Sequence, residues 1–214
     1  MRWALSGLLV AVAAAGPPGR ATPVRLALID LDGRRANPLE TPGVPFTVFV
    51  FTRTDCPISN RYAPELSRLH ERFARAGVAF WLVYADPAEP VEAIRRHLEE
   101  YGYPFGALRD PQHNLVRMTQ ARVTPEAAVF VAGPSGTPEV NPGVPLRSRS
   151  QRDRGAGPRL VYTGRIDDRY VSFGRTRAAP TTHDLERVLE ALLAGGAVAP
   201  RTTPAIGCFI PPLP

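Results

Sequence analysis

Cys56 is the residue of this sequence best suited to chemistry. It follows the apolar run FTVFVFT (46–52) and directly precedes Pro57. Proline suits the first turn of a helix, so the sequence predicts that Cys56 lies at a helix N-terminus. Unpaired backbone amides and the positive end of the helix dipole stabilise a thiolate there, which lowers the pKa of the thiol. We therefore predict that Cys56 is a nucleophile at neutral pH.

Ser59 stands where a two-thiol redox site would carry its second cysteine, so the motif is C-P-I-S and not C-x-x-C. Cys56 can attack a disulfide or a peroxide, but no neighbour at that position can resolve the product. Two roles of Ser59 remain open. Its hydroxyl either donates a hydrogen bond to the thiolate or serves as an N-terminal cap or turn residue of the helix.

Cys208, the second cysteine, lies near the C-terminus in the stretch TTPAIGCFIPP. In one interpretation it is a resolving cysteine, which attacks oxidised Cys56 and forms an internal disulfide that an outside reductant later opens. In a second, it belongs to a permanent disulfide that stabilises the fold by about 4 to 5 kcal/mol. In a third, the two thiols are independent.

The elements that must position these residues alternate along the chain. Apolar runs predict strands, and three- and four-residue spacing of apolar residues predicts helices. The predicted strands are 24–31, 46–52, 78–85, 126–132 and 159–166. The predicted helices are 58–77, 90–102, 111–120 and 182–196. This alternation predicts an α/β sheet with parallel crossovers near its centre.

The ends of the chain differ from its middle. Residues 1–21 hold Arg2, an apolar run and small residues, which together predict an export signal peptide. An uncleaved anchor is disfavoured because the apolar run, 3–15, is shorter than the roughly 20 residues of a spanning helix. We expect a single exported domain over 22–200, a surface insertion at 133–158 and a Pro-rich tail at 201–214.

The charge and the histidines indicate neither nucleic acid nor metal. The net charge of +6 comes from arginine alone, and the one dense run, Arg147–Arg159, mixes with glycine, serine and proline and predicts a solvated loop. The four histidines lack metal-ligand spacing, so solvated or capping roles are expected. The histidines are His70, His97, His113 and His183. Copper delivery is disfavoured, because a copper-delivery site would need two cysteines four residues apart and this region holds only Cys56.

Two stretches, DCPISNRYAPEL and RVTPEAAVFV, resemble the thioredoxin-fold redoxins, a group that includes the alkyl hydroperoxide reductase and thiol-specific antioxidant family. The resemblance implies a thioredoxin-like fold with a central mixed sheet flanked by helices. It also implies a cis peptide bond between Thr124 and Pro125, which leaves the Thr124 backbone free to pair with an incoming disulfide-bearing chain. No organic cofactor is implied, since electrons travel through sulfur.

Two departures from the peroxiredoxin pattern bear on function. Arg53 occupies the position where peroxiredoxins carry a threonine, and Arg122 lies upstream of the strand start where they carry an arginine. We therefore predict thiol-disulfide exchange at Cys56 with a protein disulfide or thiol, served by an external thiol reductant. Peroxide reduction is the alternative enzymatic function, and a non-catalytic binding module is the competing class. The predicted site residues are Cys56, Ser59, Thr124, Pro125 and Cys208.

Overall fold

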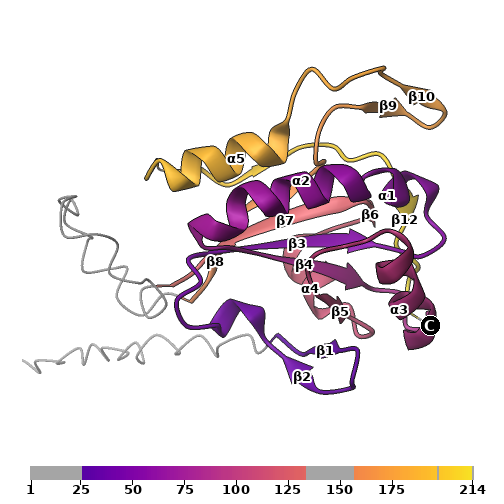
Figure 1. The fold of residues 1–214 in the computed structure, drawn as a ribbon. Helices are drawn as coiled ribbons and strands as arrows, with labels where there is room; N and C mark the ends of the chain where they lie inside the picture. The colour runs from indigo at the N-terminus through magenta and orange to yellow at the C-terminus, as the bar shows by residue number, and fades with distance from the viewer. Residues whose placement is uncertain (1–25, 134–156, 197, 214) are drawn as a thin grey trace, which may run out of the picture.

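A computed structural model of the chain describes residues 26–133, 157–196 and 198–213. Its main sheet has eight strands in the order β11-β8-β7-β3-β4-β5-β1-β2. At the centre, β3 (Phe46–Thr52) pairs parallel with β4 (Val78–Tyr84) and antiparallel with β7 (Glu126–Val131) (Figure 1). The sheet is mixed and lies between helices, which confirms the predicted α/β class.

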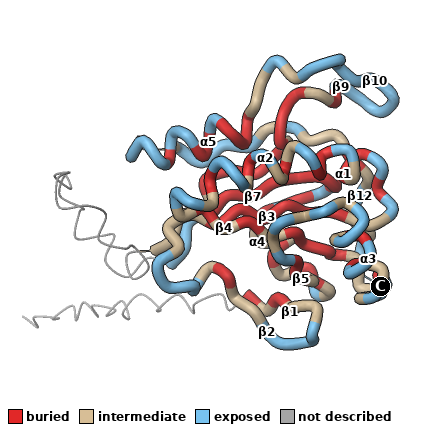
Figure 2. Tube along the Cα trace, viewed as in Figure 1, coloured by how far each residue is buried: buried red, intermediate tan, exposed pale blue. Residues whose placement is uncertain are grey.

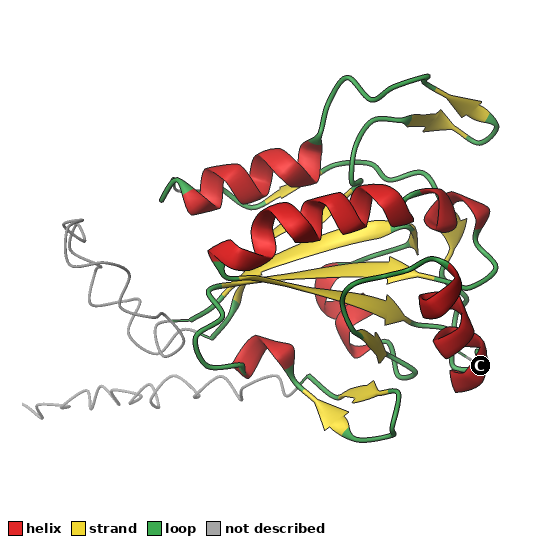
Figure 3. Cartoon of the chain, in the orientation of Figure 1, coloured by secondary structure: helices red, strands yellow, loops and turns green. Residues whose placement is uncertain are grey.

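The outer strands and the helices complete this arrangement (Figure 3). The outer strands of the sheet are β1 (Leu28–Asp30), β2 (Arg35–Ala36), β5 (Ala107–Arg109), β8 (Arg159–Gly164) and β11 (Arg201–Thr202). Two separate pairs are β9 (Tyr170–Ser172) with β10 (Arg175–Thr176), and β6 (Val123–Thr124) with β12 (Cys208–Phe209). The α-helices are α1 (Pro57–Arg61), α2 (Ala63–Phe73), α3 (Val91–Glu100), α4 (Asn114–Thr119) and α5 (Asp184–Leu193). Short 3-10 turns cover Pro38–Glu40 and Ala74–Ala76.

The core lies on both faces of β3, whose side chains alternate between two apolar clusters. Figure 2 shows β3 among the buried segments of the chain. Val48 and Val50 face the cluster that includes the apolar residues of α2, α3 and α5. Phe49 and Phe51 face the cluster that includes Leu115 of α4. All four of these side chains are fully buried. Because a strand covered on both faces needs apolar residues at every position, the unbroken run FTVFVFT is explained.

Three features differ from the sequence-based expectation. The predicted helix over 58–77 is broken at Tyr62, where α1 ends and α2 begins with Pro64 in its first turn. Proline lacks an amide hydrogen and is accommodated best at a helix start, so a new helix begins there. Strand β1 lies within the predicted strand 24–31 but is shorter, and its hairpin partner β2 and the three-residue β5 are not predicted, because so few residues give no periodic pattern.

The predicted ends of the chain are only partly described. The signal peptide at 1–21 and nearly all of the insertion at 133–158 lie outside the described residues. Within the described ranges, the structure has no helix both long and apolar enough to cross a bilayer. Domain limits at 22 and 200 remain a prediction, and residues beyond 200 contribute β11 to the main sheet.

Candidate redox site

Cys56 lies at the N-cap of α1, as the sequence predicts. Its backbone is extended, and its Sγ accepts a hydrogen bond from the Ser59 amide at 3.5 Å. The residue is fully buried. Because the sulfur faces the helix opening, burial does not separate it from the amide that stabilises its anion.

The nearest group to this sulfur is the second cysteine. Cys208 Sγ lies 2.8 Å from Cys56 Sγ, and the carbonyl oxygen of Thr124 lies 3.1 Å from it. Both cysteines are free thiols. A disulfide bond is about 2.05 Å long, so a small displacement separates this arrangement from a bonded one. The structure thus brings together two residues that are 152 positions apart in the chain.

The C-terminal tail reaches the site as a strand. In the β12–β6 pair, Cys208 lies opposite Thr124 and Phe209 opposite Val123. The pairing continues where the Ile210 amide donates to the Arg122 carbonyl at 3.0 Å. In Figure 1 the yellow β12 lies beside β6 and near α1. These backbone contacts hold Cys208 over Cys56.

The Thr124–Pro125 bond is cis, as the resemblance predicts. Thr124 is buried, and its hydroxyl donates weakly to the Cys208 carbonyl at 3.5 Å. The Thr124 backbone, expected to be free for an incoming chain, is paired instead with the protein's own tail. The site is therefore closed by a segment of the same molecule.

The two thiols have opposite pKa shifts. Burial raises the pKa of Cys56, but hydrogen bonds from Cys208, Ser59 and Thr124 lower it by more, so it lies below the ordinary cysteine value. Burial, together with the hydrogen bond and charge of Cys56, raises the pKa of Cys208 to about 11. At neutral pH, Cys208 is therefore a protonated thiol beside the Cys56 sulfur, placed to donate to it when Cys56 is ionised.

Ser59 acts mainly through its backbone. The N-cap is Cys56 itself, so a capping role for the Ser59 side chain is wrong. The buried hydroxyl makes no hydrogen bond of standard geometry with any described residue, although its proximity lowers the pKa of Cys56. Its backbone amide makes the hydrogen bond to the sulfur.

The residues before Cys56 form a small polar pocket. It has a volume of about 200 Å³ and is lined by Arg53, Thr54, Asp55, Asp86, Ala88 and Glu89. The Arg53 guanidinium pairs with Asp55 at 3.0 Å and Asp86 at 3.7 Å. Glu89, whose pKa is raised by burial, accepts from the Thr54 amide at 2.7 Å. Among the described residues, no arginine side chain hydrogen-bonds to the Cys56 sulfur.

A buried hydrogen-bond network of Tyr84, His97 and Asn60 stabilises α1 from the protein interior. The sequence did not predict this network. His97 Nδ1 accepts from the Tyr84 hydroxyl at 2.7 Å, and its Nε2 donates to Asn60 Oδ1 at 2.8 Å. Asn60 Nδ2 in turn donates to the Thr54 carbonyl at 3.1 Å. Burial lowers the pKa of His97, so the ring is neutral and this tautomer is the one required.

The prediction of solvated or capping histidines is wrong for His97, which is buried. His113 does lie at the N-cap of α4, but it is buried, and its Nε2 contacts the Ala85 carbonyl at 3.0 Å. His97 follows Ile94 by three residues on α3, and both are buried. That helical spacing was the signal that His97 faces the core.

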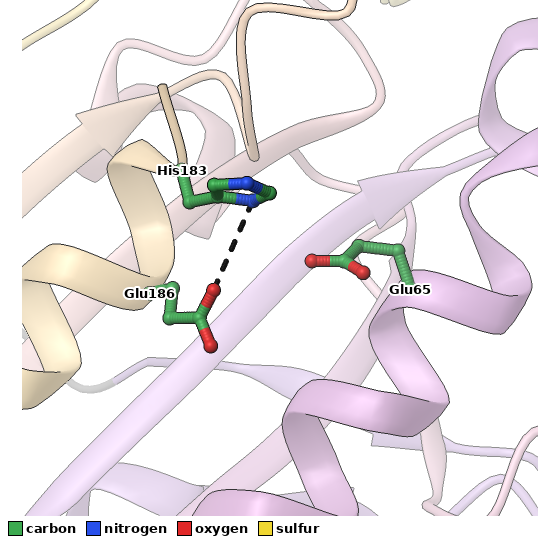
Figure 4. Close-up of side chains that lie close together, drawn as sticks. All are labelled: Glu65, His183 and Glu186. Atoms are coloured by element: carbon green, nitrogen blue, oxygen red, sulfur yellow. Dashed lines mark ion pairs between the residues drawn. The ribbon is translucent and has the colours of Figure 1, made fainter. Parts of the chain in front are cut away.

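Glu65, His183 and Glu186 also lie close together, with potential ligand atoms within 4.8 Å of one another (Figure 4). Arg68 pairs with Glu65 at 2.7 Å and with Glu186 at 2.8 Å, and Arg72 pairs with Glu186 as well. The arginines therefore neutralise the carboxylates that a cation would need. These ion pairs connect α2 to α5.

Comparisons with known proteins identify a family and similar folds. The AhpC/TSA family profile matches residues 22–138. An uncharacterized conserved protein from Geobacillus kaustophilus is 26% identical, with a TM-score of 0.63 and 86% of each chain covered. A hypothetical protein from Sinorhizobium meliloti is 24% identical, with a TM-score of 0.63 and coverage of 86% of this chain and 89% of that one.

A secreted disulfide oxidoreductase of Mycobacterium tuberculosis is 19% identical, with a TM-score of 0.43, over 61% of this chain and 92% of that one. No curated protein matches the chain. Since the AhpC/TSA profile covers more than half of the sequence, the chain belongs to the AhpC/TSA family and has a thioredoxin-like fold.

Proposed function

We propose that this protein carries out thiol-disulfide exchange with a protein partner, with Cys56 as the nucleophile and Cys208 as the resolving thiol. The observation that carries the proposal is the pair of free sulfurs 2.8 Å apart, one at a helix start and one on the tail. The opposite pKa shifts of the two thiols support the assignment of roles.

The first step is an attack of the Cys56 thiolate on one sulfur of a substrate disulfide. A new S–S bond joins Cys56 to the substrate, the substrate S–S bond breaks, and the second substrate sulfur leaves with the electron pair and takes up a proton. The product is a mixed disulfide. Cys56 no longer carries a negative charge in it, so one cause of the raised Cys208 pKa is removed.

In the second step, Cys208 loses its proton and attacks Cys56 Sγ. The Cys56–Cys208 disulfide forms, and the remaining substrate sulfur leaves as a thiolate. The substrate is reduced by two electrons, and the protein is oxidised by two. An external dithiol reductant then restores both thiols. The same steps in reverse would oxidise a substrate dithiol.

Peroxide reduction is less well supported. The peroxiredoxin position of threonine is occupied by Arg53, which pairs with Asp55 and Asp86 and not with the sulfur. Arg122 is exposed and contributes its backbone to the tail. An exported location, inferred from residues 1–21, belongs to the proposal because disulfide chemistry is typical of oxidising compartments.

The test mixes reduced protein with an aromatic disulfide, 5,5′-dithiobis(2-nitrobenzoate), and separately with hydrogen peroxide. We expect the wild type to react with the disulfide faster than free cysteine does at pH 7 and to end with a Cys56–Cys208 bond, seen by mass spectrometry. The Cys208→Ser variant should instead stop at a mixed disulfide on Cys56.

Inert Cys56 in these assays would overturn the proposal and favour a binding module. A peroxide rate far above that of free cysteine, with slow disulfide exchange, would favour a peroxidase. Cys56→Ser serves as the control, because serine has a side chain of similar size but lacks the nucleophilic sulfur.

A further inference from the structure

The tail strand β12 shows how a peptide segment can pair with β6. Gly207, the residue before Cys208, is buried against the backbone of Thr124. A Cβ added to Gly207 would lie 2.1 Å from the Thr124 carbonyl oxygen and 2.6 Å from its carbonyl carbon. Real Cβ atoms essentially never approach closer than 3.0 Å, and these contacts are backbone atoms of a paired strand. Only glycine fits this position.

Building on the proposed function, we propose that β6 selects extended peptides whose reacting cysteine directly follows a glycine. The tail is the protein's own copy of such a peptide, and a substrate strand must take its place before Cys56 can react. The partner class is therefore a protein with a Gly-Cys sequence in an exposed, extended segment.

The other positions of the tail give the rest of the preference. Ile206, before the glycine, is partly buried and packs against the core, so an apolar residue fits there. Phe209, after the cysteine, is 73% exposed, so this position imposes little selection. The β12–β6 pairing and the Ile210 amide contact are made by backbone, which any sequence supplies. Glycine before cysteine is thus the main steric requirement.

The tail is anchored at one residue, so the segment beyond that residue can exchange places with a substrate strand. Thr203 is fixed to the main sheet, because its amide donates to the Thr163 carbonyl at 3.1 Å and its hydroxyl lies 2.6 Å from the Tyr162 hydroxyl. Beyond this anchor, the segment 204–213 holds Cys208 on the two-residue strand β12. A tethered strand returns at high effective concentration, so it can replace the substrate after the mixed disulfide forms.

The experiment compares two peptides with the full-length Cys208→Ser variant. The peptides are TPAIGCFIPP and TPAIACFIPP, each with its cysteine in a disulfide with 2-nitro-5-thiobenzoate. The Cys56 thiolate attacks the peptide sulfur, a Cys56–peptide disulfide forms, and thionitrobenzoate leaves with the electron pair and is measured by absorbance. We expect the glycine peptide to react at least about tenfold faster.

A second variant pair tests the tail itself. Gly207→Ala, added to Cys208→Ser, should expel the tail and raise the rate with the glycine peptide, whereas Gly157→Ala, which meets open space, should not. Circular dichroism checks that both variants fold. The ratio of the two peptide rates is measured with Cys208→Ser alone, so it tests the proposal even if the double variant Gly207→Ala/Cys208→Ser does not fold.

The outcomes separate this inference from the proposed function. Equal rates for the two peptides, with rapid reaction of 5,5′-dithiobis(2-nitrobenzoate), would leave the function in place and overturn the glycine requirement. Failure of Cys56 to react with either peptide or with the small disulfide would overturn the function and the inference with it.

Discussion

The two cysteines lie on segments built in contrasting ways. Cys56 begins α1, directly after the central strand, and the His97–Asn60 network holds this segment from the protein interior. Cys208 lies on a two-residue edge strand held by backbone pairing to β6. The interior segment fixes its sulfur by packing, while the edge segment is held by backbone pairing and by partly buried side chains, such as Ile206, at the margin of the core.

This difference suits the two steps of exchange. A nucleophile gains from a fixed position and a lowered pKa, which the helix start and its neighbours give to Cys56. A resolving thiol must wait as a protonated group until the mixed disulfide forms, and the pKa of about 11 keeps Cys208 in that form at neutral pH. The predictions below test whether the contrast holds.

The largest effect is expected from removing each sulfur in turn. Cys56→Ser should reduce disulfide exchange to the uncatalysed background, a loss of roughly 1,000-fold or more, since no other described thiol is nucleophilic at neutral pH. Cys208→Ser should leave the first attack within about tenfold of wild type. Stopped-flow rates with a small disulfide measure both. Equal losses in the two variants would mean that the cysteines do not have separate roles.

The network beneath Cys56 should matter more for stability than any single tail contact. Tyr84→Phe leaves His97 Nδ1 buried without its donor, at a cost of about 1 to 3 kcal/mol in the free energy of unfolding. Tyr101→Phe, which removes a partly exposed acceptor of Asn60, is the matched control and should cost less. Urea denaturation measures both, and equal costs would refute the assigned role.

The pKa contrast should depend on each thiol's neighbour. Cys208→Ala removes a donor to the Cys56 thiolate, so the pKa of Cys56 should rise, whereas Cys208→Ser retains a hydroxyl donor and should raise it less. In Cys56→Ala, the pKa of Cys208 should fall from about 11 toward the ordinary value of about 8.5. Alkylation rates measured against pH follow each thiol. Unchanged profiles would contradict coupling between the sulfurs.

The two pKa shifts make the free energy of unfolding depend on pH in opposite ways. The folded pKa of Cys56 is lowered, so its contribution to stability is present above the unfolded pKa and is lost as pH falls through the folded one. The folded pKa of Cys208 is raised, so its contribution is present below the unfolded pKa and is lost as pH rises through about 11.

The smallest effect is expected at the tail anchor. Thr203→Val removes a hydroxyl that contacts Tyr162 and Arg165, but Tyr162 keeps its bond to the Arg165 carbonyl. We expect a loss of about 0.5 to 1 kcal/mol at most and faster hydrogen exchange at Ile210. Thr202→Val, on an exposed strand position, is the control. Unchanged exchange at Ile210 would mean that Thr203 does not anchor the tail.

Local patterns in the sequence predicted several elements to within a residue or two. The run 46–52 gave the central strand at its observed bounds, because a strand buried on both faces is apolar at every position. Pro57 placed Cys56 at a helix start for a similarly local reason. The sequence did not predict strand β2 or the helix break at Tyr62, because both depend on a few residues without a repeating pattern.

The sequence by itself determined the candidate nucleophile, its place before a helix-starting proline and the family resemblance, since each depends on neighbours along the chain. Only the tertiary structure decided which of three interpretations of Cys208 deserved support, because a contact between distant residues depends on strand pairing that no local pattern encodes. It also decided that Gly207 serves a close approach and that His97 is buried, because both depend on what packs against them from other segments.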